Sequence, residues 1–248
     1  MTPVLPRLAG ALLTAAFLAM PLAGSALAGE TCREDAIIVF DGSGSMSEMG
    51  FNQLDLPRIV EAREAMQRVI PQVAPLRRLG LVFYGPGPEA DLCRNVDLRF
   101  APMRDAGARI LAEIAALRPA GNTPLTEAVR LAARTLEGQQ ATVVLVTDGK
   151  ETCNGRPCRL AAELAATAPG LVVHVIGFKV RSAHFNWDGG QFQGKNRRDT
   201  VARCLADRTG GRSFTTETVD ELAQALSESL GCPVLSLRGP IPAMAGPG

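Results

Sequence analysis

Five oxygen-bearing side chains in this sequence have the types and spacing of a metal site. The segment Asp41-Gly42-Ser43-Gly44-Ser45 combines one carboxylate with two hydroxyls, and its glycines let the backbone curl until the serines lie beside Asp41. Thr123 and Asp148 follow at a distance and complete the set. Oxygen ligands suit a hard divalent cation, so we expect Mg²⁺ or Mn²⁺, with Ca²⁺ as an alternative. Hydroxyl ligands leave much of the charge of such an ion unneutralised, so that an incoming carboxylate of a protein partner would complete its shell.

The strands expected in this chain explain how these side chains come together. Apolar, β-branched runs predict buried strands at residues 36–40, 79–84, 142–147 and 171–178. Asp41 and Asp148 directly follow the first and third of these runs. In an open α/β sheet, ligands bind at the carboxyl ends of the strands. We therefore expect both carboxylates, and the hydroxyl of Thr123 at the start of a helix, at one edge of the sheet.

Helices are expected between the strands, where apolar residues recur at helical spacing. The stretches are 59–70, 110–117, 125–136 and 222–230, the first with Asp55 as its N-cap, Pro57 in its first turn and Pro71 at its end. The connection 85–95 is too short for the crossover between parallel neighbours, so a strand at 96–100 should pair antiparallel at a sheet edge. The predicted fold is α/β and doubly wound, with a mostly parallel central sheet, one antiparallel edge strand and helices on both faces.

The candidate metal residues resemble the metal-ion-dependent adhesion site of the von Willebrand factor type A domain family. That motif is D-x-S-x-S followed by a distant Thr and a distant Asp, and every position is filled here. The similarity extends over about residues 36–230 and implies a Rossmann-like fold. It also implies that the serines, and Thr123 in one state, touch the ion directly, while the aspartates act largely through bound water. Lys150, Glu151 and the segment from Cys153 to Cys158 look like those of bacterial exported members.

Simpler interpretations of these fragments compete with a metal site. Segment 41–45 could be only a polar turn, and Thr123 only a helix N-cap. A phosphotransferase with an aspartyl nucleophile needs a carboxylate where Ser43 stands, and neither His174 nor His184 suits a serine hydrolase. No complete phosphate-binding Gly-x-x-x-x-Gly-Lys-Ser/Thr motif occurs, because Asn196 follows Gly194-Lys195 where the motif needs a serine or threonine. We therefore expect no enzyme but an adhesion-type binding module, the alternatives being a metal-dependent hydrolase or a structural envelope protein with a stabilising metal.

The N-terminal segment of the chain predicts export. Arg7 precedes an apolar run at residues 8–22, and Ala26-Leu27-Ala28 provides the small residues of a cleavage site, so residues 1–28 read as a signal peptide. A retained membrane anchor is the alternative, and no later stretch is apolar over the ~20 residues of a membrane span. Residues 29–232 form the expected domain, and residues 233–248 a disordered tail rich in proline and glycine. The expected location is periplasmic or secreted.

The charge balance argues against nucleic acid as a partner. Lysine and arginine number 26 against 25 acidic residues, so the formal net charge is +1. A cluster of basic residues at Lys195, Arg197, Arg198 and Arg203 reads as a solvated face. The surrounding stretch 179–197 lacks helical periodicity and carries Asp188-Gly189-Gly190, which predicts a small hairpin. Its Phe185 and Trp187 either contact a partner around the ionic anchor or pack the hairpin on itself.

Six cysteines in an exported chain predict three disulfides. Cys153 and Cys158 enclose a turn-forming segment, which favours a local bridge between them. Zinc binding is disfavoured because the chain has no second cysteine pair and its two histidines are scattered. The remaining cysteines would then pair Cys32 with Cys232, across the domain termini, and Cys93 with Cys204.

Overall fold

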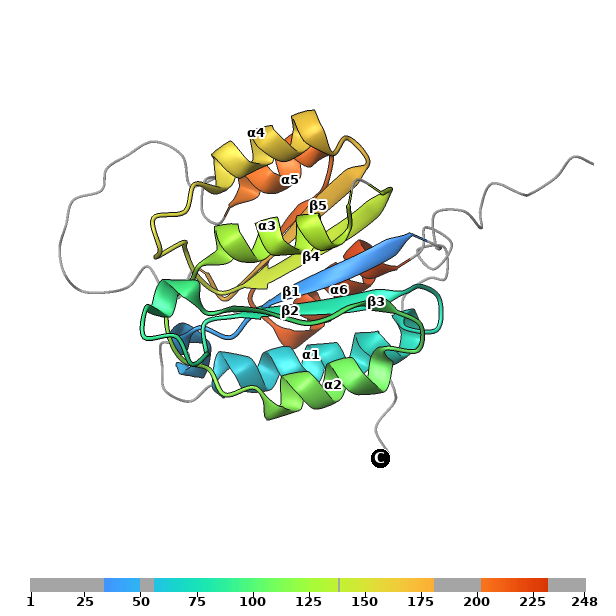
Figure 1. The fold of residues 1–248 in the computed structure, drawn as a ribbon. Coiled ribbons are helices and arrows are strands. Elements are labelled where there is room, and N and C mark those ends of the chain that lie inside the picture. Colours follow the sequence, from blue (N-terminus) through green and yellow to red (C-terminus); the bar gives the residue numbers. More distant parts are fainter. Residues whose placement is uncertain (1–33, 50–55, 138, 181–201, 232–248) are drawn as a thin grey trace, which may run out of the picture.

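The computed structural model describes residues 34–49, 56–137, 139–180 and 202–231. Their strands form one sheet in the order β3-β2-β1-β4-β5-β6, with helices on both faces (Figure 1). Neighbouring strands run parallel except for β2 and β3, which pair antiparallel at one edge. The predicted fold class, including the antiparallel edge strand, is confirmed.

The strands form where β-branched and aromatic residues cluster. Their bounds are β1 (Asp35–Asp41), β2 (Leu79–Tyr84), β3 (Val96–Met103), β4 (Ala141–Thr147), β5 (Leu171–Phe178) and β6 (Ser213–Thr216). In β1, Ile38 and Phe40 face one core cluster while Ile37 and Val39 face the other. Because helices cover both faces of the sheet, side chains on both sides of a central strand are apolar. This is why the central strands are continuous apolar runs in the sequence. The short edge strand β6 lacks such a run and was not predicted.

Three helices cover each face of the sheet (Figure 1). One layer holds α1 (Arg58–Val73), α2 (Gly107–Ala116) and α6 (Val219–Leu230), and the other α3 (Leu125–Thr135), α4 (Pro157–Thr167) and α5 (Arg203–Thr209). Short 3-10 turns lie at η1 (Gly44–Ser47) and η2 (Leu92–Arg94). The apolar stripes predicted for α1, α2, α3 and α6 are buried in these layers. Helices α4 and α5 were not predicted.

Two details of the predicted helix ends are wrong. Pro71 lies inside α1, which continues to Val73, because the buried side chains of Ile70 and Val73 anchor the last turn in the core. Thr123 does not cap α3, since Pro124 occupies the cap position and the carboxylate of Glu151 accepts from the N–H of Thr126 in the first turn. Pro57 directly precedes α1, whereas Asp55 lies outside the described residues.

The cysteine pairing also differs from the prediction. Cys93 is bridged to Cys153 and Cys158 to Cys204, with Cα–Cα distances of 5.4 and 5.2 Å. The predicted pairs Cys153–Cys158 and Cys93–Cys204 are therefore wrong. Cys158 belongs to α4, which packs beside α5 and its Cys204, while Cys153 lies in the preceding loop, against the η2 turn. The pair Cys32–Cys232 lies outside the described residues, and none of the described cysteines is free.

Several further predictions fall on residues that the structure does not describe. They concern the signal peptide at 1–28, the tail at 233–248, and the hairpin with Phe185, Trp187 and the basic residues 195–198. Arg203 is described and forms an ion pair with Asp207 one helical turn on in α5. Within the described ranges, no helix combines the length and apolar character of a membrane span.

His174 lies within β5, and its surroundings favour the neutral form of its side chain. Its Nδ1 accepts a hydrogen bond from the backbone N–H of Arg212 at 3.1 Å, which requires an unprotonated nitrogen. Burial, followed by the charges of Arg212 and Arg77, lowers the pKa of His174 from 6.5 to about 4. His174 therefore acts as a structural residue of the sheet.

This lowered pKa predicts acid sensitivity of the fold. The unfolded chain binds a proton at His174 near pH 6.5 and the folded chain only near pH 4, so stability from this residue is complete above pH 6.5 and is lost as the pH falls toward 4. After allowance for partial exposure, the loss should be roughly 2 kcal/mol. Urea unfolding of wild type and His174→Asn between these pH values measures it. The variant should show the smaller loss, and equal losses would contradict the assignment.

Candidate metal centre

The candidate site lies at the switch point of the sheet. From β1 the chain proceeds to β2 and β3 on one side, whereas β4 is followed by β5 and β6 on the other. Asp41 is the last residue of β1 and Asp148 directly follows β4, with Phe40 of β1 paired to Val146 of β4. Open α/β sheets bind ligands at the carboxyl ends of strands at such a point. Both predicted carboxylates thus lie together, with Asp41 0% and Asp148 1% exposed.

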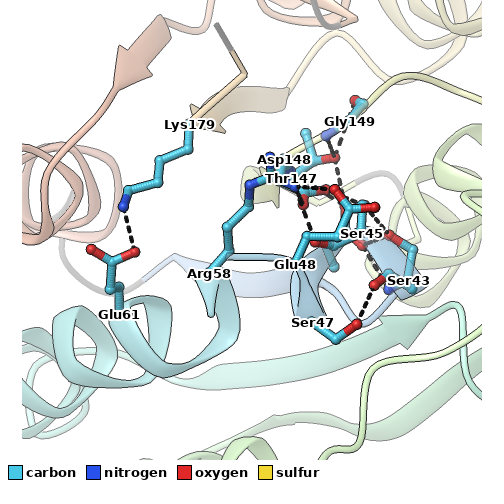
Figure 2. A network of polar contacts seen from close by, with 12 residues as sticks. Ser43, Ser45, Ser47, Glu48, Arg58, Glu61, Thr147, Asp148, Gly149 and Lys179 are labelled. Atoms are coloured by element: carbon cyan, nitrogen blue, oxygen red, sulfur yellow. Dashed lines mark hydrogen bonds and ion pairs between the residues drawn. The ribbon is translucent and has the colours of Figure 1, made fainter. Parts of the chain in front are cut away.

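A chain of closely spaced oxygen atoms joins these two carboxylates, and Figure 2 shows its part from Ser43 through Ser45 to Asp148. The Oγ of Ser43 donates to Oδ1 of Asp41 at 2.6 Å, and the Oγ of Ser45 donates to Oδ1 of Asp148 at 2.7 Å. The two serine hydroxyls are 3.0 Å apart. Gly85 after β2 makes this close packing possible, because its φ is +109° and an added Cβ would lie 2.5 Å from the backbone nitrogen of Ser43.

Thr123 reaches the same edge through its loop. The carbonyl of Gly121 accepts from the N–H of Gly44 at 3.1 Å, which attaches this loop to the serine-bearing turn. On its other side, the N–H of Thr123 donates to Oγ1 of Thr152 at 2.8 Å, and the N–H of Thr152 donates to the carbonyl of Thr123 at 3.2 Å. Thr152 follows Asp148 in the chain, so the loops of all five predicted residues meet at one edge.

Two residues that the sequence analysis missed hold Asp41 in place. Its Oδ2 accepts from the hydroxyl of Tyr84 at 2.7 Å and from Oγ1 of Thr147 at 2.8 Å, which leaves Oδ1 to Ser43. Burial and the negative charge of Asp41 raise the pKa of Tyr84 well above its usual value, so the phenol remains a donor. Tyr84 is the sole tyrosine of the chain and ends a predicted strand. Its polar hydroxyl at the carboxyl end of that strand could have indicated that it belongs to the site.

Arg58 is the third residue that the sequence analysis missed. It opens α1 and is only 3% exposed, although it is charged. Its Nη1 donates to Oδ2 of Asp148 at 3.0 Å, to the backbone carbonyl of Ser45 at 3.0 Å and to Oε2 of Glu48 at 3.3 Å (Figure 2). Nothing in the local sequence distinguishes Arg58 from the other basic residues, because its partners lie elsewhere in the chain.

The electrostatics of the site favour a bound cation. Burial, and then the charge of Asp41, raises the pKa of Asp148 from 3.8 to about 7, an effect that Ser45 and Arg58 only partly oppose. Two carboxylates in a buried site thus repel one another, and a cation between them would relieve that repulsion. The described residues hold no group of three or more His, Cys, Asp or Glu that could bind a metal. The donor set instead consists of two carboxylates and three hydroxyls, which fits a hard ion such as Mg²⁺.

Fold and site together define a doubly wound α/β domain with an oxygen-donor site at the switch point of its sheet. The model of the von Willebrand factor type A domain matches residues 36–151, which contain all five predicted site residues. Residues 36–151 therefore match this family.

The chain is also similar to individual proteins, to one in sequence and to others in fold. The chain is 24% identical over 200 residues to the uncharacterised protein YwmD of Bacillus subtilis (strain 168), covering 76% of this chain and 81% of YwmD. An aerotolerance-related membrane protein of Bacteroides fragilis NCTC 9343 shares the fold with a TM-score of 0.55 and 16% identity over 79% of this chain and 98% of that one. Proximal thread matrix protein 1 of the mussel byssus, solved with its adhesion-site motif occupied by zinc, has a TM-score of 0.52 and 19% identity, covering 80% and 46% of the two chains. At these identities the structural matches show a shared fold.

Proposed function

We propose that this protein is an exported protein-binding module that grips an acidic side chain of its partner through a divalent cation. The observation that carries the proposal is the continuous chain of oxygen atoms from Asp41 through Ser43 and Ser45 to Asp148. The zinc-occupied motif of the mussel protein supports it, because that protein has the same fold.

The roles of the residues follow from the donor set. Ser43, Ser45 and Thr123 would touch the ion directly, and Asp41 and Asp148 would hold it largely through bound water. The ion would supply positive charge for a carboxylate of the partner. Tyr84 and Thr147 keep Asp41 oriented toward the serines by donating to its other oxygen. Mg²⁺ or Mn²⁺ is the expected ion and Ca²⁺ the alternative.

The surroundings of the site support binding rather than catalysis. His174, the one histidine among the described residues, accepts a hydrogen bond from the backbone of Arg212 within the sheet. Export is supported by the two disulfides, since such bridges persist in oxidising compartments such as the periplasm or the extracellular space. Phe185 and Trp187 follow β5, whose carboxyl end lies at the same edge, and remain candidates for apolar partner contacts.

Capture of partner proteins from envelope extract tests this function. Immobilised wild-type protein should retain a partner in Mg²⁺, and chelator, Asp41→Ala or Thr123→Ala should abolish the retention because each removes the ion or one of the groups that would hold it. Thr135→Ala is the matched control, since Thr135 lies in α3 and donates to the carbonyl of Leu131 at 2.9 Å, within that helix. Retention that survives both chelator and the site variants would contradict the proposal.

A parallel assay addresses the competing class of function. Wild type and Ser43→Ala should both lack turnover of phosphate and carboxylic ester substrates in Mg²⁺ or Mn²⁺. If wild type hydrolyses such a substrate and Ser43→Ala does not, the protein is a metal-dependent hydrolase and the proposed binding function is wrong.

A further inference from the structure

Arg58 joins three segments that surround the candidate metal centre. A single nitrogen, Nη1, donates to Asp148 after β4, to the carbonyl of Ser45 in η1 and to Glu48 after η1. Arg58 and Asp148 are buried, whereas the side chain of Glu48 is 65% exposed. The contact with Asp148 is thus shielded from water, and it fixes the carboxylate more firmly than a surface ion pair would.

This contact leaves the two oxygens of Asp148 in different positions. Oδ2 is held by Arg58 at 3.0 Å, and Oδ1 accepts from the hydroxyl of Ser45 at 2.7 Å. Only Oδ1 therefore belongs to the chain of oxygen atoms that leads to Asp41 (Figure 2). The carboxylate cannot turn both oxygens toward that chain without breaking the bond to Arg58.

The number of available oxygens distinguishes the candidate ions. Ca²⁺ takes six to eight oxygen ligands in flexible geometry and often binds a carboxylate through both oxygens. Mg²⁺ is smaller, requires nearly octahedral geometry and keeps several waters. A carboxylate that presents one oxygen, even through a bound water, suits Mg²⁺, which keeps several waters, but it cannot become the two-oxygen ligand that Ca²⁺ often takes.

We propose that Arg58 is a specificity-determining residue that makes the site select Mg²⁺ over Ca²⁺ by holding one oxygen of Asp148. The inference rests on the proposed function, since it presupposes that the site binds a divalent ion. The positive charge of Arg58 also repels either ion, but it repels both to the same degree. The ratio of the two affinities therefore isolates the effect of the held oxygen.

Calorimetric titration of the mature protein with Mg²⁺ and with Ca²⁺, separately, tests this inference. In Arg58→Met, which keeps an unbranched apolar stem, the ratio of Ca²⁺ to Mg²⁺ affinity should rise about tenfold. In Arg58→Lys, whose single ammonium cannot reproduce the planar donor arrangement, it should rise to an intermediate value. Arg68→Met is the matched control, because Arg68 is exposed on α1 and pairs with Glu64 and Asp220.

Each outcome is decisive. An unchanged ratio in Arg58→Met, whether both affinities rise or fall, would overturn the inference and leave Arg58 a general electrostatic or structural role. If Arg58→Met does not fold, an unchanged ratio in Arg58→Lys overturns it in the same way. If wild type binds neither ion, the proposed function itself fails. Binding by wild type with an unchanged ratio in the variants removes only the selectivity role.

Discussion

Replacing Ser43 by alanine is expected to lower the affinity for Mg²⁺ or Mn²⁺ at least ~100-fold, because it removes a direct ligand and breaks the hydroxyl contacts to Asp41 and Ser45. Asp148→Asn should have a comparable effect, since it removes a charge that holds the ion while it keeps the shape of the side chain. Calorimetry on the purified mature protein measures both. The unfolding midpoint of Ser43→Ala without added ion should stay near that of wild type, because the serine lies on a loop at the sheet edge.

Ser47→Ala provides the control for this loss. Ser47 belongs to the same turn, but its hydroxyl is exposed and donates to the carbonyl of Gly44 at 2.7 Å, away from the carboxylates. Its replacement should leave metal affinity unchanged. Unaltered binding in both Ser43→Ala and Asp148→Asn would show that the five residues do not form a metal site.

Removing the bridge between Cys93 and Cys153 should destabilise the fold and loosen the metal site together. The bridge closes a segment with a sequence separation of 60, and such a loop contributes about 4 kcal/mol to the free energy of unfolding. Cys153 directly follows Thr152, whose side chain and backbone hold the loop of Thr123. The double variant Cys93→Ser/Cys153→Ser should therefore lose stability in urea unfolding and also bind Mg²⁺ more weakly.

The second bridge separates these two effects. Cys158→Ser/Cys204→Ser opens a sequence separation of 46 between α4 and α5, which should cost a similar ~4 kcal/mol while it leaves metal affinity unchanged. Peptide mapping without reduction checks the pairing directly. Recovery of Cys153 joined to Cys158 would contradict the structure, and equal metal affinity in both double variants would contradict the role of the Cys93 bridge.

The sheet and the place of the candidate site residues at its edge could be predicted because their signals are local. The predicted bounds of β2 and β5 are exact and β1 and β4 extend only slightly beyond them, since a strand buried on both faces needs a continuous apolar run. Asp41 ends such a strand, and Ser43 and Ser45 follow it at alternate positions of the turn. The place of these residues at the sheet edge therefore follows from the strand itself.

Only the tertiary structure decided which distant groups meet these residues. Arg58 and Asp148 are 90 positions apart, Tyr84 and Asp41 are 43 apart, and Thr147 and Asp41 are 106 apart. The predicted bridge from Cys153 to Cys158 failed for the same reason, because closeness in sequence was taken as closeness in space. Helix α4 begins between these two cysteines and carries Cys158 to α5, while the preceding loop brings Cys153 to the η2 turn. Local periodicity predicts the elements of this protein. Contacts between elements depend on how the layers pack, and local patterns in a single sequence do not reveal that packing.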